Sequence, residues 1–191
     1  MKILLASKSP RRRELLSRLG YDLDFIDIDF DENRVKNTQI PIATLAQTLA
    51  HGKAQAYDAN ALDDDTLLVT ADTVVVLDNK ALGKPANRDE AIAMLQSLSG
   101  RTHTVYTGVC LRGRTATKLF TEATQVHFKT LSQQEITHYV DTCRPYDKAG
   151  AYGIQEWIGM IGIESINGDY YNVMGLPLCH LQKELSAWSQ Q

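Results

Sequence analysis

The sequence of 191 residues predicts a single globular domain of the mixed α/β class. Segments in which apolar residues recur at helical spacing alternate with β-branched runs, and some of those runs are joined by tight turns. Hydrophobic residues make up 43% of the chain and charged residues 23%, so the chain has enough apolar side chains for a sizeable core. Helices, strands that can pair in parallel, and hairpins in one chain favour a single α/β domain over residues 1–191.

The first predicted elements are a short strand at residues 3–6 and a helix that starts after Ser9. Ser9 suits the N-cap, Pro10 suits the first helical position, and Gly20 closes the leucine repeat of the helix. Arginines occupy positions 11–13 in the first turn, where the helix dipole disfavours cations by about 0.3–1 kcal/mol each. Taken alone, this cluster is either a solvated basic turn or a site for an anion such as phosphate.

The next elements lie between residues 25 and 79. Alternation of apolar and acidic residues predicts a half-buried strand at residues 25–30, and an apolar stripe predicts a helix at residues 41–57. The β-branched run 66–77 predicts a long central strand, and Asp78-Asn79 after it predicts a turn.

The second half of the chain begins with a helix whose start and end are both marked. Asn87, with Glu90 three residues later, predicts a capping box, and Gly100 predicts the end of the helix. Periodicity then predicts strands at 102–112 and 116–128, a helix from Ser132 to about Thr142, and a final helix at 178–188. Residues 146–177 are rich in glycine and aromatic residues and receive no assigned element.

Charge and composition exclude several classes of function. The net charge of −3 and the pI near 5.9 argue against a protein that binds nucleic acid or an anionic membrane surface. The three cysteines, Cys110, Cys143 and Cys179, lack the spacing of a metal site, and their odd number does not suggest a disulfide framework. No segment approaches the ~20 apolar residues that span a bilayer. We therefore expect a cytoplasmic protein.

Two residues contradict the pattern of their own element. Asp72 lies inside the apolar run 66–77, where a carboxylate is costly unless it meets a cation, a metal or hydrogen-bond donors. We favour a functional carboxylate over a strand that bends at Asp72 and exposes it. Lys53 falls inside the apolar stripe of its own helix unless Gly52 ends that helix. Its side chain either extends to water or reaches an anion.

Three further positions are weaker candidates for functional residues. Lys84 follows a glycine, but Asp78 and Pro85 stand where a P-loop needs glycine and Ser or Thr, so a Walker A loop is excluded. Glu32 belongs to an acidic pair that could hold a hard divalent cation through oxygen ligands. Gln155 has an amide that can recognise a base edge through a paired donor and acceptor.

The order of these features resembles the Maf family of nucleoside triphosphate pyrophosphatases over nearly the whole chain. The motifs that carry the resemblance are Ser7-x-Ser9-Pro-Arg-Arg, Ala71-Asp-Thr73, Gly83-Lys-Pro85, Asp147-Lys-Ala-Gly-Ala-Tyr-Gly-Ile-Gln155 and Asn167-Gly-Asp-Tyr-x-Asn-Val-x-Gly-Leu-Pro177. The resemblance implies hydrolysis of a nucleotide between its α and β phosphates with a divalent cation, Mg²⁺ or Mn²⁺. It also implies a curved, elongated mixed sheet flanked by helices, two lobes with a cleft between them, and a homodimer as a common assembly.

The same resemblance implies roles for individual residues. Asp72 matches the proton acceptor, and Glu32 with Asp72 matches the metal ligands. The Ala-Tyr-Gly-Ile-Gln form is similar to the branch that acts on dTTP and UTP, in a housecleaning role that extends to modified pyrimidine nucleotides. Glu156 departs from the pattern, because many members have glycine there. The positions that match phosphate contacts or substrate choice are Ser7, Arg11, Arg12, Lys53, Thr73, Lys84 and Gln155, with Arg13 as a solvated neighbour.

Three alternatives remain open at this stage. One is a non-catalytic, nucleotide-binding regulator of septum formation, which would need the cations but no carboxylate at position 72. Another is a nucleic-acid-binding module that uses the arginines at 11–13, against which the acidic total counts. The third is a pyrophosphatase for purine or non-standard triphosphates such as ITP, which charge alone does not distinguish from the pyrimidine enzyme.

Overall fold

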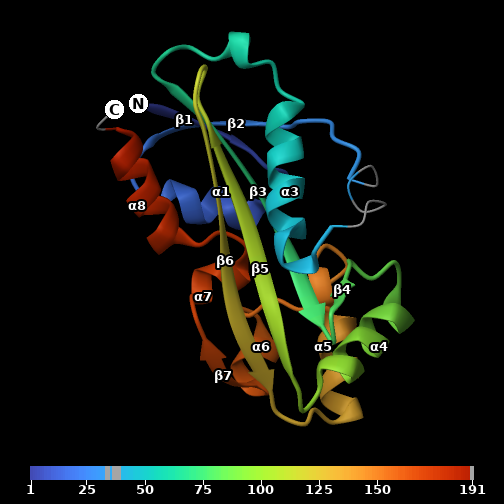
Figure 1. Ribbon diagram of the computed structural model, residues 1–191. Coiled ribbons are helices and arrows are strands. Elements are labelled where there is room, and N and C mark those ends of the chain that lie inside the picture. Colours follow the sequence, from blue (N-terminus) through green and yellow to red (C-terminus); the bar gives the residue numbers. More distant parts are fainter. Residues whose placement is uncertain (33–34, 36–39, 190–191) are drawn as a thin grey trace. The chain divides into compact units, whose positions relative to one another are not determined.

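The computed structural model describes residues 1–32, 35 and 40–189 (Figure 1). Within these ranges helices and strands follow one another, with two single-turn 3-10 helices at Ala59–Ala61 and Ala149–Ala151. In chain order the elements are β1 (Lys2–Ala6), α1 (Pro10–Ser17), β2 (Asp22–Ile26), α3 (Ile42–Gln55), β3 (Thr66–Leu77), β4 (Lys80–Leu82), α4 (Arg88–Leu98), β5 (Thr102–Arg112), β6 (Thr117–Phe128), α5 (Gln133–Cys143), α6 (Trp157–Gly162), β7 (Ile163–Asn167), α7 (Tyr170–Met174) and α8 (Leu178–Trp188).

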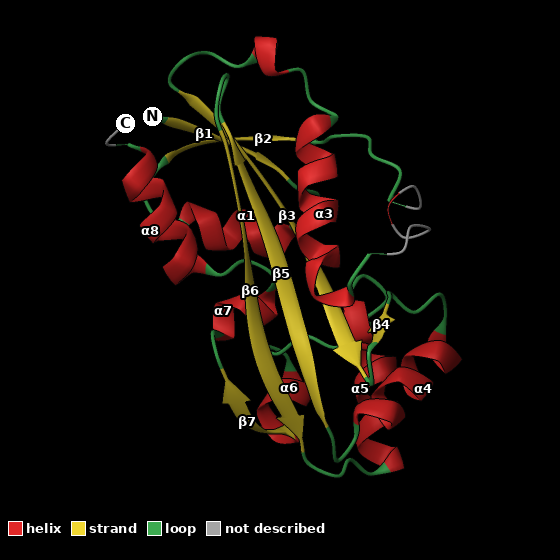
Figure 2. Ribbon diagram, in the orientation of Figure 1, coloured by secondary structure: helices red, strands yellow, loops and turns green. Residues whose placement is uncertain are grey.

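Hydrogen bonds join seven strands into a mixed sheet with the order β2-β1-β3-β5-β6-β7, and β4 pairs with β3 (Figure 2). Strand β1 pairs in parallel with both β2 and β3, whereas the pairs β3–β4 and β6–β7 are antiparallel. Parallel and antiparallel pairing in one sheet flanked by helices confirms the predicted mixed α/β class.

The chain forms two compact units. Unit 1 comprises Met1–Thr73, Thr107–Glu122 and Gly175–Gln191, and unit 2 comprises Val74–Tyr106 and Ala123–Met174. Strands β3, β5 and β6 therefore each contribute residues to both units. The extent of the domain, residues 1–191, stays a prediction.

Helix α3 of unit 1 lies directly against β5 because Gly108 has no side chain. A Cβ at position 108 would come within 2.2 Å of the backbone nitrogen of Gln47, a distance that real Cβ atoms do not reach. Thr70 of β3 adds a hydrogen bond, in which its hydroxyl donates to the carbonyl of Ala50 at 2.6 Å. The helix is thus fixed against the sheet over its middle turns.

The C-terminal end of α3 is also fixed. Arg112, at the end of β5, donates to the carbonyls of Ala54 and Tyr57, the latter at 2.9 Å, so a cation satisfies carbonyls that a helix end leaves without partners. The helix continues through Gly52 to Gln55, so Lys53 lies within its last turn.

The core of unit 2 contains aromatic residues. The predicted capping box of α4 forms only in part: Asn87 accepts from the backbone nitrogen of Glu90, but the Glu90 carboxylate accepts from Ala86 and not from Asn87. Helix α5 begins at the predicted Ser132, which forms a complete capping box with Glu135. These caps position both helices over one apolar cluster. Its buried members are Val75, Leu77, Ala91, Leu95, Leu98, Val105, Val126, Phe128, Leu131, Ile136, Tyr139, Val140, Ala151, Tyr152, Ile154 and Ile158.

The turn after β3 has the expected form. Asp78 and Asn79 both have positive φ, 48° and 58°, and lead into β4. Two central residues with positive φ match the twist of a tight hairpin, and asparagine and aspartate tolerate that conformation better than most side chains.

The predicted strand at 25–30 is wrong in position. Strand β2 covers Asp22–Ile26, and its parallel register runs from Lys2 opposite Asp22 to Ala6 opposite Ile26. Five paired residues of β1 set the length of β2, so residues 27–30 find no partner there. None of the helices in the described ranges is both long and apolar enough to cross a membrane.

Candidate active site

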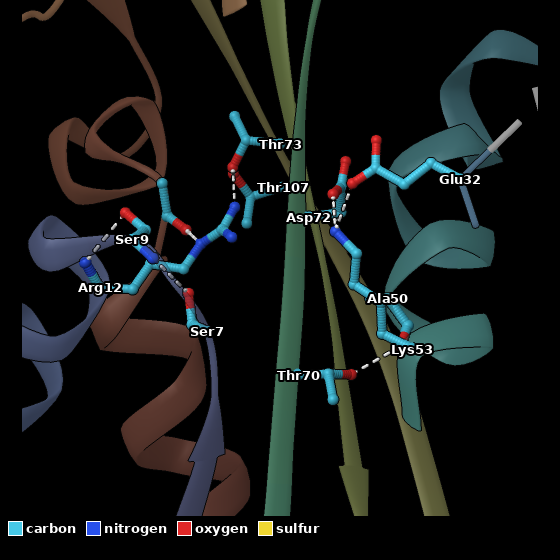
Figure 3. Close-up of polar contacts among 11 residues, drawn as sticks. Ser7, Ser9, Arg12, Glu32, Ala50, Lys53, Thr70, Asp72, Thr73 and Thr107 are labelled. Carbon is cyan, nitrogen blue, oxygen red and sulfur yellow. Dashed lines mark hydrogen bonds and ion pairs between the residues drawn. The ribbon is translucent and has the colours of Figure 1, made fainter. Parts of the chain in front are cut away.

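The centre of unit 1 is an ammonium group held between two carboxylates (Figure 3). Lys53 Nζ lies 2.5 Å from Asp72 Oδ1 and 2.9 Å from Glu32 Oε1. The side chain of Asp72 is 13% exposed and that of Lys53 is 19% exposed. Strand β3 continues through Asp72 to Leu77, so the alternative in which the strand bends there is wrong. Asp72 stays inside an apolar strand because it meets a cation.

The opposite face of β3 carries a second polar group. Adjacent residues of a strand point to opposite faces, and Figure 3 shows Thr73 directed away from Asp72 towards Arg12. Arg12 Nη2 donates to Thr73 Oγ1 at 2.9 Å, and Arg12 Nε donates to the carbonyl of Gly175 at 2.7 Å. The hydroxyls of Thr73 and Thr107 lie 2.9 Å apart. Burial lowers the pKa of Arg12, while the negative charge of Asp72 opposes that shift.

The N-terminus of α1 has the predicted cap. Ser9 Oγ accepts from the backbone nitrogen of Arg12 at 3.5 Å, and Ser7 Oγ accepts from the backbone nitrogen of Ser9 at 3.2 Å. The side chain of Arg13 has partners within the protein. Its Nε donates to the carbonyl of Ser7 at 2.8 Å, and its Nη2 donates to Asp27 Oδ1 at 3.1 Å. Arginine side chains therefore stabilise the loop before α1 as well as occupying its first turn.

In unit 2, the loop that follows α5 lies against the end of β4. The backbone nitrogen of Gly150 donates to the carbonyl of Gly83 at 3.0 Å, next to the exposed Lys84. Gly150 has a φ of 71°, and a Cβ there would lie 3.1 Å from Val75, so both conformation and space favour glycine. Gln155 is half-buried, and its Oε1 meets no donor within the described part of the chain.

The structure thus sorts the predicted site residues into two groups, one in each unit. Unit 1 contains Ser7, Arg11, Arg12, Glu32, Lys53, Asp72 and Thr73; unit 2 contains Lys84 and Gln155. Sequence reasoning missed two partners of the first group. Thr107 lies in a buried strand where its hydroxyl gives no distinguishing pattern, and Gly175 contributes only a carbonyl oxygen.

The carboxylates of unit 1 fit the divalent cation that the sequence predicts. No group of three or more His, Cys, Asp or Glu residues suited to a metal occurs among the described residues. Glu32 and Asp72 nevertheless direct one oxygen each at the same positive charge, the ammonium of Lys53. Mg²⁺ is commonly bound through one or two carboxylates, with water and substrate phosphates as its other ligands, so two carboxylates suffice.

Fold and site together describe a mixed α/β protein in which unit 1 holds a lysine between two carboxylates on one face of β3 and an arginine on the other. The family model described as "Maf-like protein" matches residues 2–188. The chain belongs to the Maf family.

Curated relatives resemble the chain over almost its full length. A protein from Bacteroides thetaiotaomicron is 49% identical over 185 residues, which covers 96% of this chain and 94% of the relative, and is named dTTP/UTP pyrophosphatase. A protein from Porphyromonas gingivalis with the same name is 47% identical over 197 residues, covering 99% and 95%. A solved dITP/XTP pyrophosphatase from Mycobacterium abscessus is a more distant likeness, with a TM-score of 0.40 and 17% identity over 67% of this chain and 73% of the other.

Proposed function

We propose that this protein is a pyrophosphatase that hydrolyses dTTP and UTP to the nucleoside monophosphate and pyrophosphate. The observation that carries the proposal is the carboxylate of Asp72, held inside β3 by Lys53 beside Glu32. A protein that only binds nucleotides needs cations for the phosphates but no carboxylate among them. The name shared by relatives at 47–49% identity supports the choice of substrate.

The reaction requires a base that takes the proton of the attacking water and cations that stabilise the charge on the leaving pyrophosphate. Water attacks the α phosphorus, its oxygen forms the new P–O bond, and the bond from the α phosphorus to the bridging oxygen breaks. We assign the water proton to Asp72, because a carboxylate next to the attacking water can act as general base. Lys53 holds Oδ1 of Asp72, so we assign Oδ2 to the water.

The leaving pyrophosphate gains negative charge, which cations stabilise more in the transition state than in the ground state. From unit 1 we assign Ser7 and Arg11 to the phosphates, with Arg12 fixing Thr73 beside them. From unit 2 we assign Lys84 to a phosphate and Gln155 to the base. A divalent cation held by Glu32 and Asp72 would supply further charge neutralisation at the phosphates.

Product analysis tests the reaction directly. The purified protein is incubated with dTTP, UTP, CTP, ITP and 7-methyl-GTP in the presence of Mg²⁺ or Mn²⁺, and the products are separated. We expect monophosphate and pyrophosphate from dTTP and UTP, and in ¹⁸O-labelled water the label should enter the monophosphate. Release of orthophosphate with a nucleoside diphosphate would contradict the proposal.

The same panel separates the alternatives. Turnover of ITP in preference to dTTP and UTP would indicate the purine branch, and binding without turnover would indicate a regulator. We place the reaction in the cytoplasm, which is consistent with the three free cysteines Cys110, Cys143 and Cys179. A homodimer is the assembly that we expect, and analytical ultracentrifugation checks it.

A further inference from the structure

A single carboxylate of unit 2 joins three parts of the chain. Glu156 Oε1 lies 3.0 Å from Lys148 Nζ, and Glu156 Oε2 accepts a hydrogen bond from the Tyr139 hydroxyl. The same hydroxyl accepts from the backbone nitrogen of Gly153 at 3.1 Å. Glu156 therefore connects α5, the buried lysine before the glycine-rich loop, and the end of that loop.

Burial makes this connection difficult to replace. The side chain of Lys148 is only 9% exposed. Its Nζ also lies 2.8 Å from Asp147 Oδ1, but the side chain of Asp147 is 56% exposed. Glu156, at 25%, is more buried than Asp147. Tyr139 is fully buried, and burial together with Glu156 raises its pKa, so it remains a protonated donor to Glu156. Without Glu156, a buried cation and a buried hydroxyl would each lose a main partner.

Glu156 also closes the turn that contains Gln155. Its backbone nitrogen donates to the carbonyl of Gly153 at 3.0 Å, and a Cβ on Gly153 would lie only 2.8 Å from the Glu156 carboxylate carbon. The Oε1 of Gln155 has no donor within the described ranges, so that oxygen does not hold the residue in place. The neighbouring residues Gly153 and Glu156 make the hydrogen bonds that fix this turn.

The side-chain amide of glutamine can form hydrogen bonds with more than one kind of nucleotide base. One orientation presents an acceptor and a donor that match the N3–H and carbonyl of uracil or thymine. Rotation by 180° exchanges them and matches the acceptor and amino group of cytosine. Discrimination between these bases therefore requires that the surroundings hold Gln155 in one orientation.

We propose that Glu156, through Lys148 and Tyr139, is a positioning residue that fixes the turn of Gln155 and thereby determines selectivity for uracil and thymine over cytosine. This inference rests on the proposed function, in which Gln155 contacts the base. Glu156 itself does not contact the nucleotide. Its loss relaxes selectivity while the groups assigned to the phosphates are unchanged.

The test compares Glu156→Ala and Glu156→Gln with Glu164→Ala, a control in the same unit whose side chain is 60% exposed. We measure kcat and KM for UTP, dTTP and CTP, and the inhibition constant of inorganic pyrophosphate. Loss of about one hydrogen bond's free energy corresponds to roughly tenfold, so Glu156→Ala should raise KM for UTP and dTTP about tenfold and shift the UTP/CTP ratio of kcat/KM towards CTP. The inhibition constant of pyrophosphate should stay within about twofold of the wild-type value.

The conservative variant keeps the inference testable if Glu156→Ala does not fold. Glutamine retains an acceptor for Tyr139 but loses the charge opposite Lys148, so Glu156→Gln should lie between the wild type and Glu156→Ala in selectivity. The inference is overturned if the active wild type and the Glu156 variants share one UTP/CTP ratio, or if pyrophosphate affinity falls in parallel with nucleotide affinity. A wild-type protein that releases no pyrophosphate from UTP or dTTP overturns the proposed function and this inference together.

Discussion

Asp72 remains in an apolar strand because Lys53 supplies the charge that a carboxylate loses when it leaves water. Their charged atoms lie 2.5 Å apart and both side chains are little exposed. Loss of one partner of this pair should therefore cost more free energy than loss of one partner of a surface salt bridge. Glu32 adds a second negative charge at 2.9 Å from the same ammonium. At the residue scale, the site is a cluster of one positive and two negative charges, in which one cation serves both carboxylates.

The first prediction concerns the role of Asp72 as base. Asp72→Asn has nearly the same shape and can still accept a hydrogen bond from Lys53, so the fold should be kept. The variant should lose roughly 10²- to 10⁴-fold in kcat, the usual contribution of a general base. Steady-state kinetics with dTTP, together with circular dichroism to check the fold, measures both. Turnover close to that of the wild type would remove Asp72 from this role.

At the element scale, the position of Lys53 depends on how α3 lies on the sheet. Gly108 allows the backbone of α3 to approach β5, Thr70 binds Ala50, and Arg112 caps the last turn. These contacts act on the helix from its middle to its end. The geometry of the site therefore depends on residues that do not belong to it.

Gly108→Ala tests the approach of α3. A methyl group would meet the backbone of Gln47 at 2.2 Å, and backbone atoms cannot move aside as a flexible side chain can. We expect a loss of about 3 kcal/mol in the free energy of unfolding, at the upper end of overpacking costs. Urea denaturation measures it. Gly83→Ala is the matched control, because a Cβ at position 83 meets nothing within 4 Å; equal losses in both variants would contradict the explanation.

A second prediction at this scale concerns His103 in β5. Burial lowers its pKa to about 4, and its Nε2 lies 2.7 Å from the hydroxyl of Tyr152 while its ring stacks on Phe128. The folded protein holds this histidine neutral, whereas the unfolded chain protonates it near pH 6.5. The free energy of unfolding therefore keeps its full value above about pH 6.5 and falls by about 3 kcal/mol as the pH drops to 4.

Urea denaturation between pH 7.5 and 4.5 checks this dependence, with His103→Gln as the comparison. Glutamine does not titrate in this range, so the variant should lose much of the slope even if it is less stable overall. A slope identical in both proteins would assign the acid sensitivity to other groups.

At the scale of the whole molecule, the charge balance predicts how the protein responds to metal removal. Lys53 already offsets the repulsion between Glu32 and Asp72, so the fold does not need a divalent cation. Treatment with EDTA should abolish turnover and leave the thermal midpoint of unfolding unchanged, within about 1 °C. Differential scanning calorimetry and the product assay measure the two effects. A marked fall in the midpoint would show that metal binding contributes to folding.

Much of the fold follows from local sequence signals. The caps at Ser9, Asn87 and Ser132 begin helices where they were expected, because a side chain that satisfies free backbone amides acts locally. Residues 146–177 could not be assigned. Their path depends on positive φ at Gly150 and Ala151 and on contacts with distant segments, which leave no periodicity in the sequence.

The site was predictable to a similar degree. Asp72 and Lys53 were identifiable because each contradicts the pattern of its own element, and the structure brings them together. Thr107 and Tyr139 were not identifiable, since a buried hydroxyl fits an apolar strand or helix and gives no such contradiction. Their roles depend on partners that only the folded chain provides, Thr73 for one and Gly153 for the other.

The alternation of β3 also limits which changes in chain length the protein can accept. Asp72 and Thr73 serve opposite faces of one strand, and β1 fixes its register by parallel pairing from Lys2 opposite Thr66 to Ala6 opposite Thr70. One residue inserted or deleted between Thr70 and Asp72 would exchange the two faces, turning the carboxylate towards Arg12 and the hydroxyl towards Lys53. We expect this stretch to tolerate many substitutions in its apolar positions and no single-residue insertion or deletion.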